Sequence, residues 1–231
     1  MNQHTHAMPE PLSADAQPLM VPPSEEMLAR LEQRRSAPLR GLAGPGPTPD
    51  ELTRMMILAT RVPDHGRLVP WRFILVEGDA RRDLGERLDA LYGAQAKDAV
   101  PPVAAPPGDM WTQYMTRAPL TVILVSKPDM ASKVPAWNQV LSAGAAGMAL
   151  TVAASALGFT SQWLLKWPGR DPEATALLGL TPAERVAGFI HIGRPVALNA
   201  ERPRPVLDQV VTSWAPPAGM PAQSSISNET P

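Results

Sequence analysis

The stretch that most constrains the fold of this chain is residues 140–157, which are built largely from alanine, glycine, serine and other uncharged residues. It follows Pro135 and precedes Gly158, which favours a helix that ends at a left-handed glycine cap, with Phe159 packing after it. Alanine dominates and polar residues interrupt the run, so a buried helix is favoured over a membrane span. Small side chains permit very close packing, either in the chain's own core or against a second copy.

Charge and cysteine content exclude several kinds of protein. The chain has 231 residues, enough for one domain, and a net charge of −1 with a pI near 6.4, so it offers no basic field for nucleic acid or an anionic membrane. It has no cysteine, which excludes disulfides, iron–sulfur clusters and cysteine nucleophiles. We see no signal-peptide pattern and expect a cytoplasmic protein without nucleic-acid or membrane partners.

Many of the 28 prolines fall in the two ends and one internal patch. We therefore expect a disordered arm over residues 1–23, one folded domain over 24–214 and a disordered tail over 215–231. Residues 97–108 read as a mobile loop or lid.

Helix-start signals divide the domain. Ser24 is expected to cap a first helix that ends near Arg34, and the sequence TPDE from Thr48 is a capping box with proline at the first helical position. Asp79 opens a further helix, and Asp171 and Thr181 repeat the cap–proline–acid signal for two helical turns.

Four segments have the composition of strands: residues 71–77, 120–126, 160–165 and 185–192. The second is apolar throughout, which indicates burial on both faces. Helical segments separate these strands, so the residues alone leave two fold classes open, α+β or α/β with one sheet.

The usual catalytic motifs are absent. Of the four histidines, two lie in the expected arm, and His65 and His191 are far apart in sequence without metal-ligand spacing, so we expect no metal site. There is no G-x-S-x-G elbow, Walker A loop or G-x-G-x-x-G fingerprint.

Four softer motifs remain, and the first is Arg34-Arg35-Ser36. Two guanidinium groups and a hydroxyl suit the binding of a phosphate. Alternatively, the arginines complement the negative end of the helix.

The other three motifs lie further along the chain. Pro63-Asp64-His65 leads through a loop to PWRF at residues 70–73, where a backbone can approach a flat ligand, although a lone loop histidine is more often simply solvated. KVPAWNQ at residues 133–139 precedes SAGAAG at residues 142–147. Gly158-Phe159 is followed by Trp163.

In order and spacing these motifs resemble the small single-domain bacterial NAD(P)H nitroreductases of the nitroreductase family, over residues 28–214. The resemblance implies an α+β sandwich, in which helices flank a central, mainly antiparallel sheet. It also implies an intertwined homodimer whose long helices pack across the two-fold axis, with two FMN molecules at the subunit interface.

The resemblance also implies roles for particular residues. The phosphate and ribityl chain of FMN would be held by Arg34, Arg35 and Ser36. The flavin ring of the partner's site would lie at His65 and Val69, and the flavin would be lined by Trp163, Leu164 and Leu165. The nicotinamide contact would fall on Val152, Ala153, Ala154, Ser155, Ala156 and Leu157.

The implied activity is a ping-pong transfer of electrons from NADH or NADPH to a nitroaromatic, a quinone or a similar small oxidised acceptor. The flavin carries the chemistry, so no catalytic side chain is expected. Two alternatives stay open: a flavin dehydrogenase of one metabolite, and a flavin-binding or degenerate protein of the same fold without turnover.

Two departures from the family pattern favour the second alternative. Val69 stands where relatives carry an amide, and Leu164-Leu165 stand where they carry Arg-Ser. Both changes make the expected pocket poorer in hydrogen-bond donors, so the sequence predicts weaker flavin binding or a changed redox potential.

Overall fold

The computed structural model describes residues 22–98, 108–197 and 200–216, which belong to two compact units that divide between Asn199 and Ala200. The second unit contains one short 3-10 helix, Leu207–Gln209. The expected arm, lid and tail lie almost wholly outside the described residues. The domain boundary expected at residue 214 stays a prediction.

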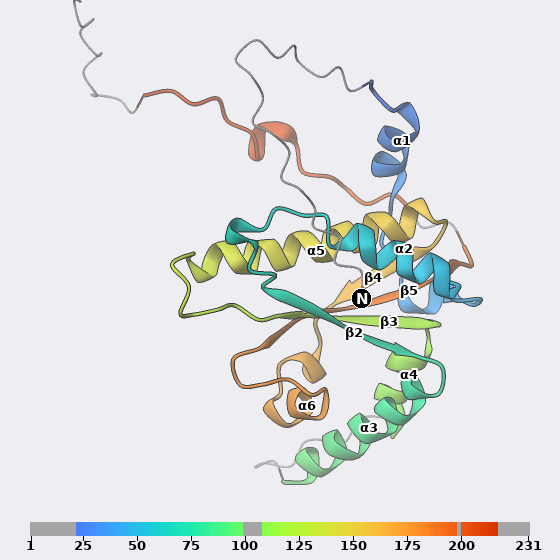
Figure 1. Ribbon diagram of the computed structural model, residues 1–231. Coiled ribbons are helices and arrows are strands. Elements are labelled where there is room, and N and C mark those ends of the chain that lie inside the picture. The colour runs from blue at the N-terminus through green and yellow to red at the C-terminus, as the bar shows by residue number, and fades with distance from the viewer. Residues whose placement is uncertain (1–21, 99–107, 198–199, 217–231) are drawn as a thin grey trace, which may run out of the picture. The chain divides into compact units, whose positions relative to one another are not determined.

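The first unit alternates helices with strands (Figure 1). Its α-helices are α1 (Glu25–Gln33), α2 (Pro49–Ala59), α3 (Ala80–Asp98), α4 (Met110–Thr116), α5 (Ala136–Ala156) and α6 (Pro172–Leu177). Its strands are β1 (Leu42–Ala43), β2 (Trp71–Glu77), β3 (Leu120–Ser126), β4 (Thr160–Leu164) and β5 (Arg185–Pro195). Its 3-10 helices are Leu39–Gly41, His65–Arg67 and Trp167–Gly169.

All the strand pairs are antiparallel. β2 pairs with β3, β3 with β5, and β5 also with β4 and β1. This topology decides between the two classes that the residues left open, and it confirms the α+β prediction with a central antiparallel sheet.

Helices cover both faces of the sheet (Figure 1). α5, with α2 packed against it, covers one face, and α3, α4 and α6 cover the other. β3 serves both sides: Val122 and Leu124 belong to the core cluster of α5, whereas Ile123 and Val125 belong to the opposite cluster. Every residue of β3 is buried, which confirms the prediction from its apolar composition.

Three of the predicted helix starts are confirmed by their caps. Ser24 accepts a hydrogen bond from the backbone of Met27 (3.3 Å), and Thr48 and Glu51 form the reciprocal capping box. Asp171 caps α6. The helical turn predicted at Thr181 is wrong: the segment makes only a turn, in which the Glu184 carboxylate accepts from the Thr181 amide, because β5 begins at the next residue.

Sequence analysis missed α4 and β1. The amides of the second and third residues of α4 are capped from another helix, since the Asp89 carboxylate of α3 accepts from Trp111 (2.7 Å) and Thr112 (2.9 Å). β1 has only two residues and pairs with the end of β5. Neither element carries its own local signal, because tertiary partners complete both.

α5 forms where the small-residue run predicted it. Gly158 has a φ of +78°, and the Phe159 amide donates to the Ala154 carbonyl (2.9 Å), which closes the predicted glycine cap. Among the described helices, α5 alone has the length and composition of a membrane span. Half of its most apolar window is buried inside the first unit, as in a core helix.

Candidate functional site

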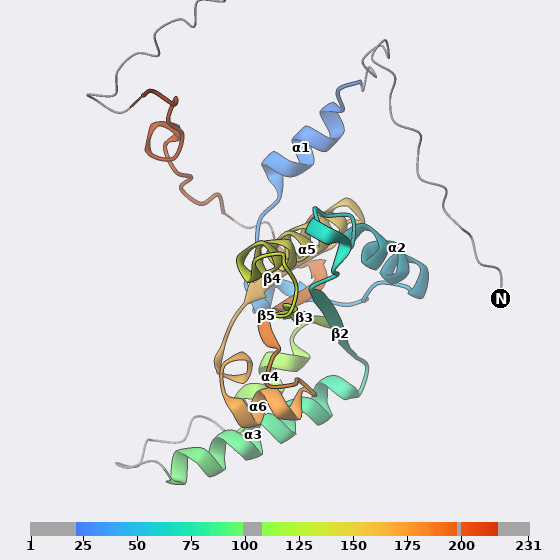
Figure 2. The same cartoon turned by 60° about the vertical axis from the view of Figure 1, so that its left-hand side comes forward.

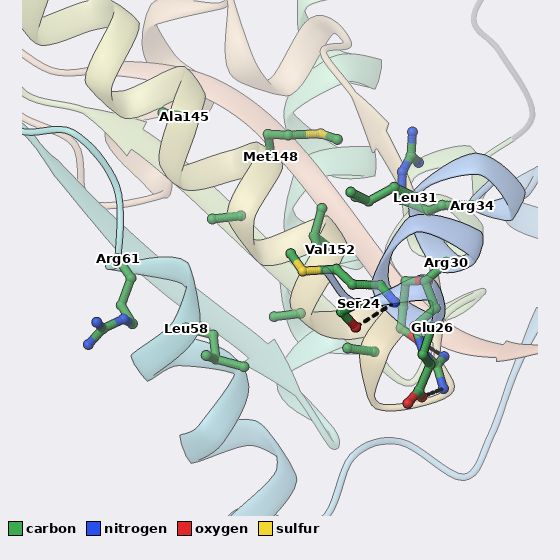
Figure 3. Close-up of a pocket in the computed structure, with 15 residues that line it drawn as sticks. Ser24, Glu26, Arg30, Leu31, Arg34, Leu58, Arg61, Ala145, Met148 and Val152 are labelled. Atoms are coloured by element: carbon green, nitrogen blue, oxygen red, sulfur yellow. Dashed lines mark hydrogen bonds and ion pairs between the residues drawn. The ribbon is translucent and has the colours of Figure 1, made fainter. Parts of the chain in front are cut away.

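The main hollow of interest is a groove of about 810 Å³ between α1, the end of α2 and the C-terminal half of α5 (Figure 3). Its floor is apolar and comes from α5, with Ala145, Met148 and Val152 labelled in the figure. Leu31 on α1 and Leu58 on α2 add apolar walls. The groove can therefore take a flat apolar group against α5.

Cationic side chains surround this apolar floor. Arg30 and Arg34 come from the α1 side and Arg61 from the end of α2, whereas Glu26 is the one carboxylate that lines the groove. The guanidinium groups of Arg34 and Arg61 make no hydrogen bond or ion pair with the part of the chain that the structure describes. The groove thus combines an apolar floor with positive charge that is available to an anion.

α1 is held over this groove by few contacts. It has no buried residue, and Figure 2 shows it standing off the body of the unit. The Arg30 guanidinium donates to the carbonyl of Ser155 on α5 (3.1 Å) and pairs with Glu26 (3.4 Å). Its apolar side chains Met27, Leu28 and Leu31 are all exposed.

The predicted phosphate residues follow α1 directly and join the sheet. Ser36 forms a parallel bridge with Ser161 at the start of β4, and the Ala37 amide donates to the Ser161 carbonyl (3.1 Å). The hydroxyl of Thr160 donates to the Arg35 carbonyl (3.3 Å). This bridge brings two motifs that are far apart in sequence side by side.

The two arginines of the first motif do different things. Arg34 is the C-cap residue of α1 and lines the groove. The Arg35 guanidinium donates to the carbonyls of Glu32 and Arg34 (3.0 Å to the latter). In this structure Arg35 makes the helix-end contacts that the alternative interpretation described, and Arg34 is free to meet a ligand.

The predicted nicotinamide residues divide by helical periodicity. Four line the groove: Val152, Ala153, Ser155 and Ala156. Ala154 is fully buried in the core, and Leu157 packs against the same core cluster. The contiguous prediction of six residues therefore mixes the outer face of α5 with its inner face.

The loop that carries His65 and Val69 is held by Asp64. The Asp64 carboxylate accepts from the amides of Leu68 (3.1 Å) and Val69 (2.9 Å). Val69 has a φ of +47°, a left-handed conformation that is strained for a β-branched residue, and its side chain is half exposed. Its backbone N–H is therefore already used, and its side chain offers no polar atom.

This loop is tied to the N-terminal part of α5, not to the groove. His65 Nδ1 lies 3.3 Å from the side-chain nitrogen of Asn138, and the Ser142 hydroxyl donates to the Pro63 carbonyl. Asn138 and Ser155 are separated by about 25 Å along the helix, from the rise of 1.5 Å per residue. One protomer therefore places its predicted ring contacts and its predicted phosphate contacts at opposite ends of α5.

Trp163 is held between two glycines. A Cβ on Gly147 of α5 would lie 2.3 Å from the indole, and one on Gly188 of β5 would lie 1.9 Å from it. The indole N–H donates to the Ala187 carbonyl (3.1 Å). The side chain of Trp163 thus packs α5 onto the sheet. The flavin contact predicted for Trp163 would therefore come from its backbone atoms.

Leu164 and Leu165 lie away from the groove. Leu164 points to the core cluster on the opposite face of the sheet, as alternation along β4 requires. Leu165 lines a second hollow of about 770 Å³ beside α6. The structure therefore does not bring these two side chains together with Arg34.

The groups with shifted pKa values lie outside the groove. Burial lowers the pKa of His191 to about 3, and its Nδ1 lies 2.9 Å from the Thr121 hydroxyl. Burial also raises the pKa of Tyr114. The hydrogen bonds from Arg72 lower the pKa of Glu184 to about 2. Within the described ranges, no cluster of acidic and histidine side chains suits a metal ion.

Among the groove residues that sequence reasoning missed are Arg30, Arg61 and Met148. Arg30 and Arg34 are four residues apart and so share a face of α1, and Met148 lies one turn before Val152 on α5. Helical spacing from the predicted residues was thus a signal for two of them. Arg61 follows α2 and depends on tertiary packing alone.

The antiparallel α+β sandwich of this chain is the fold of nitroreductase-like proteins. A sequence profile of the nitroreductase family matches residues 31–194. The chain belongs to the nitroreductase family, and it is an oxidoreductase by that membership.

Two relatives and two solved structures show how far the similarity extends. The "Putative NAD(P)H nitroreductase YdjA" of Escherichia coli K12 is 31% identical over 187 residues, 78% of this chain and 97% of the relative. A "Putative NAD(P)H nitroreductase" of Haemophilus influenzae is 33% identical over 187 residues, 79% of this chain and 95% of the relative.

The solved structures share the fold at lower identity. A nitroreductase-like family protein from Bacillus cereus has a TM-score of 0.70 at 17% identity, covering 85% of this chain and 99% of the other. An FMN-bound nitroreductase from Bacteroides fragilis has a TM-score of 0.62 at 22% identity, covering 83% of this chain and all of the other. These structures confirm the predicted nitroreductase-like fold.

Proposed function

We propose that this protein is an FMN-dependent oxidoreductase that passes electrons from NADH or NADPH to nitroaromatic, quinone or similar small oxidised acceptors in a ping-pong sequence. The observation that carries the proposal is the groove, in which the guanidinium groups of Arg34 and Arg61 have no partner among the described residues and stand over an apolar floor. Relatives that are named NAD(P)H nitroreductases and an FMN-bound neighbour support it.

The residues present fit FMN. Arg34 is half-buried, makes no contact with an acidic side chain among the described residues, and stands two residues from the exposed hydroxyl of Ser36. A phosphate binds best to this combination of a guanidinium and a hydroxyl. When bound, FMN would supply the capacity to accept and donate a hydride or electrons, and the side chains would supply position and charge.

The nicotinamide would lie on the small-residue wall of the groove. Val152, Ser155 and Ala156 present little bulk there, so a planar ring can approach the backbone of α5 closely. The carbonyl of Ser155 is already bonded to Arg30, which holds α1 at the mouth of the groove. The arginines of the rim would neutralise the phosphates of a dinucleotide.

We also propose that the protein is a homodimer, formed through the outer face of α5. This face carries large exposed apolar side chains at spacings of three and four residues, including Trp137, Leu141 and Met148. The exposed Ile57 and Leu58 of α2 extend it. A contiguous apolar surface of this kind marks an interaction site, and an isologous dimer would cover it on both chains at once.

A dimer would also bring the predicted phosphate contacts and the predicted ring contacts together. Each protomer has the Arg34 end and the His65–Val69 end of α5 about 25 Å apart. In an antiparallel pair of α5 helices, each end of one helix lies beside the opposite end of the other. Two equivalent sites would result, each with phosphate contacts from one chain and ring contacts from its partner.

The proposal is tested by an absorbance spectrum of the purified protein, before and after addition of NADPH without oxygen. We expect flavin bands that bleach with NADPH and return when 1,4-benzoquinone is added. A protein that stays colourless after incubation with FMN would contradict cofactor binding. A coloured protein that no nicotinamide bleaches would instead be a flavin-binding module without this turnover, or a dehydrogenase of another donor.

A further inference from the structure

The outer face of α5 carries apolar side chains at equal spacings on both sides of a small central pair. From its N-terminal end the face reads Trp137, Leu141, then the small Gly144 and Ala145, then Met148 and Val152. Leu141 and Met148 lie equally far from the midpoint between Gly144 and Ala145, and so do Trp137 and Val152. Such a pattern suits a two-fold axis through the small pair.

The centre of this face is open enough for close approach. A Cβ on Gly144 would have no atom of its own protomer within 4 Å. By contrast, a Cβ on Gly147, one turn further on, would collide with Trp163 and Leu124. No packing within the described part of the chain requires a glycine at residue 144, and a second helix crossing at this point would explain it.

The symmetry fixes which residues would meet across the two-fold axis. In an antiparallel helix pair centred between Gly144 and Ala145, Leu141 of one chain faces Met148 of the other, and Trp137 faces Val152. Val152 is on the floor of the groove. The indole of Trp137 is two-thirds exposed in the single chain, at 68%, and is long enough to bridge helices that diverge from their crossing point.

We propose that Trp137 closes the groove of the partner subunit and packs on the flat ring of the donor or acceptor bound there. The inference rests on the homodimer of the proposed function. It assigns Trp137 as a binding residue that acts in trans: the groove of each protomer has an apolar floor, and none of the described residues that line it is aromatic. An indole over a planar, electron-poor ring is a favourable offset stack.

The register is tested by cross-linking, since the chain has no cysteine to confuse the result. The double variant Trp137→Cys/Val152→Cys, treated with a short bis-maleimide, is expected to give a covalent dimer. Trp137→Cys alone and Val152→Cys alone are the controls, because each position would lie about 20 Å from its own copy across the axis. No covalent dimer from the double variant, in a protein that light scattering shows to be dimeric, would overturn the register.

The binding role is tested by kinetics on the flavin-loaded dimer. Trp137→Ala is expected to raise KM for both NADPH and 1,4-benzoquinone about tenfold at unchanged FMN content, measured at a protein concentration at which light scattering shows the variant to be fully dimeric. Trp137→Phe should recover most of the loss, and Trp214→Ala, which removes a still more exposed tryptophan from the second unit, should change neither KM.

The outcomes separate this inference from the proposed function. Unchanged KM values for Trp137→Ala in a yellow dimer would overturn the role of Trp137 and leave the proposed function intact. A protein that is a monomer in solution, or that never binds flavin, would overturn both.

Discussion

The inner and outer faces of α5 are built from the same kinds of residue but meet different surroundings. On the inner face Ala143, Ala146 and Leu150 are buried against the sheet, and Gly147 makes room for the indole of Trp163. On the outer face Leu141 and Met148 stand exposed on either side of Gly144. An ordinary surface helix would have a polar outer face.

This difference shows why α5 is central to the function. A helix that is apolar all round must be covered all round, and the first unit covers only one side of it. The predicted ligand contacts also lie along its exposed side, at both ends. In the proposed dimer, fold, association and cofactor binding meet on one helix, and substitutions on its two faces should have separable effects.

The largest effect is expected at the inner face. Gly147→Leu would place a side chain where the indole of Trp163 and the methyl group of Leu124 already lie, 2.3 and 2.8 Å from the new Cβ. Overpacking of a rigid core costs about 1–3 kcal/mol and sometimes more. The free energy of unfolding, measured with urea, should fall by at least that much. An unchanged unfolding midpoint would show that the inner face is not tightly packed.

The matched change on the outer face should act on association instead. Gly144→Leu meets no atom within its own protomer, and leucine is a better helix former than glycine by about 0.8 kcal/mol. The monomer should therefore stay folded, while light scattering shows a dimer weakened by about tenfold to a hundredfold. An unchanged dissociation constant of the dimer would show that the interface does not lie on this face.

At the groove, the two arginines of one motif should differ in effect. Arg34→Ala should raise the dissociation constant of FMN by about tenfold to a hundredfold, because a charge-assisted hydrogen bond contributes about 1.5–3 kcal/mol. Arg35→Ala should weaken FMN less, since the Arg35 guanidinium bonds helix carbonyls. Riboflavin, which has no phosphate, serves as the control ligand in the same fluorescence titration. Equal losses for FMN and riboflavin would mean that Arg34 is structural.

At the opposite end of α5, Val69 allows a finer comparison. Val69→Gln would supply the amide that relatives carry and should tighten FMN up to about tenfold. Val69→Gly relieves the strained φ of +47° without adding a polar group, so it should raise thermal stability and leave FMN affinity unchanged. If both variants tighten FMN equally, strain and not the missing amide limits binding.

The smallest effect is expected away from α5, at the ion pair of Arg72 with Glu184 (2.6 Å). Arg72 lowers the pKa of Glu184 from 4.5 to about 2, so the pair's stabilisation is complete above pH 4.5 and is lost as the pH falls through 2. Arg72→Met should cost up to about 1 kcal/mol at pH 7 and progressively less as Glu184 is protonated. Unfolding curves across this pH range test it, and FMN affinity at pH 7 should not change.

Much of the fold could be predicted from the sequence because local signals and tertiary packing agree there. The capping box at Thr48, the apolar strand at residues 120–126 and the cap at Gly158 each specify their element locally. The helical turn at Thr181 failed because a strand begins immediately after its cap signal. α4 was missed because its cap, Asp89, is on another helix.

The candidate site was less predictable for a physical reason. Both faces of α5 are apolar, so periodicity could not say which small residues face the sheet. The sequence left core packing and self-association open for this run, and the structure buries Gly147 against Trp163. The approach of Arg61 and of α1 to the groove depends on packing between helices. A sequence motif specifies residue types, but which face of a helix each residue occupies is determined only by the fold.

The central claim is that each site is shared by two protomers, and mixing two defective variants tests it most directly. Arg34→Ala damages the groove, and Asp64→Ala releases the amides of Leu68 and Val69 at the other end of α5. After subunit exchange, heterodimers should contain one site with both defects and one intact site, so NADPH oxidation should recover to about a quarter of the wild-type rate. Activity that stays at the average of the two parents would show that each site lies within a single chain.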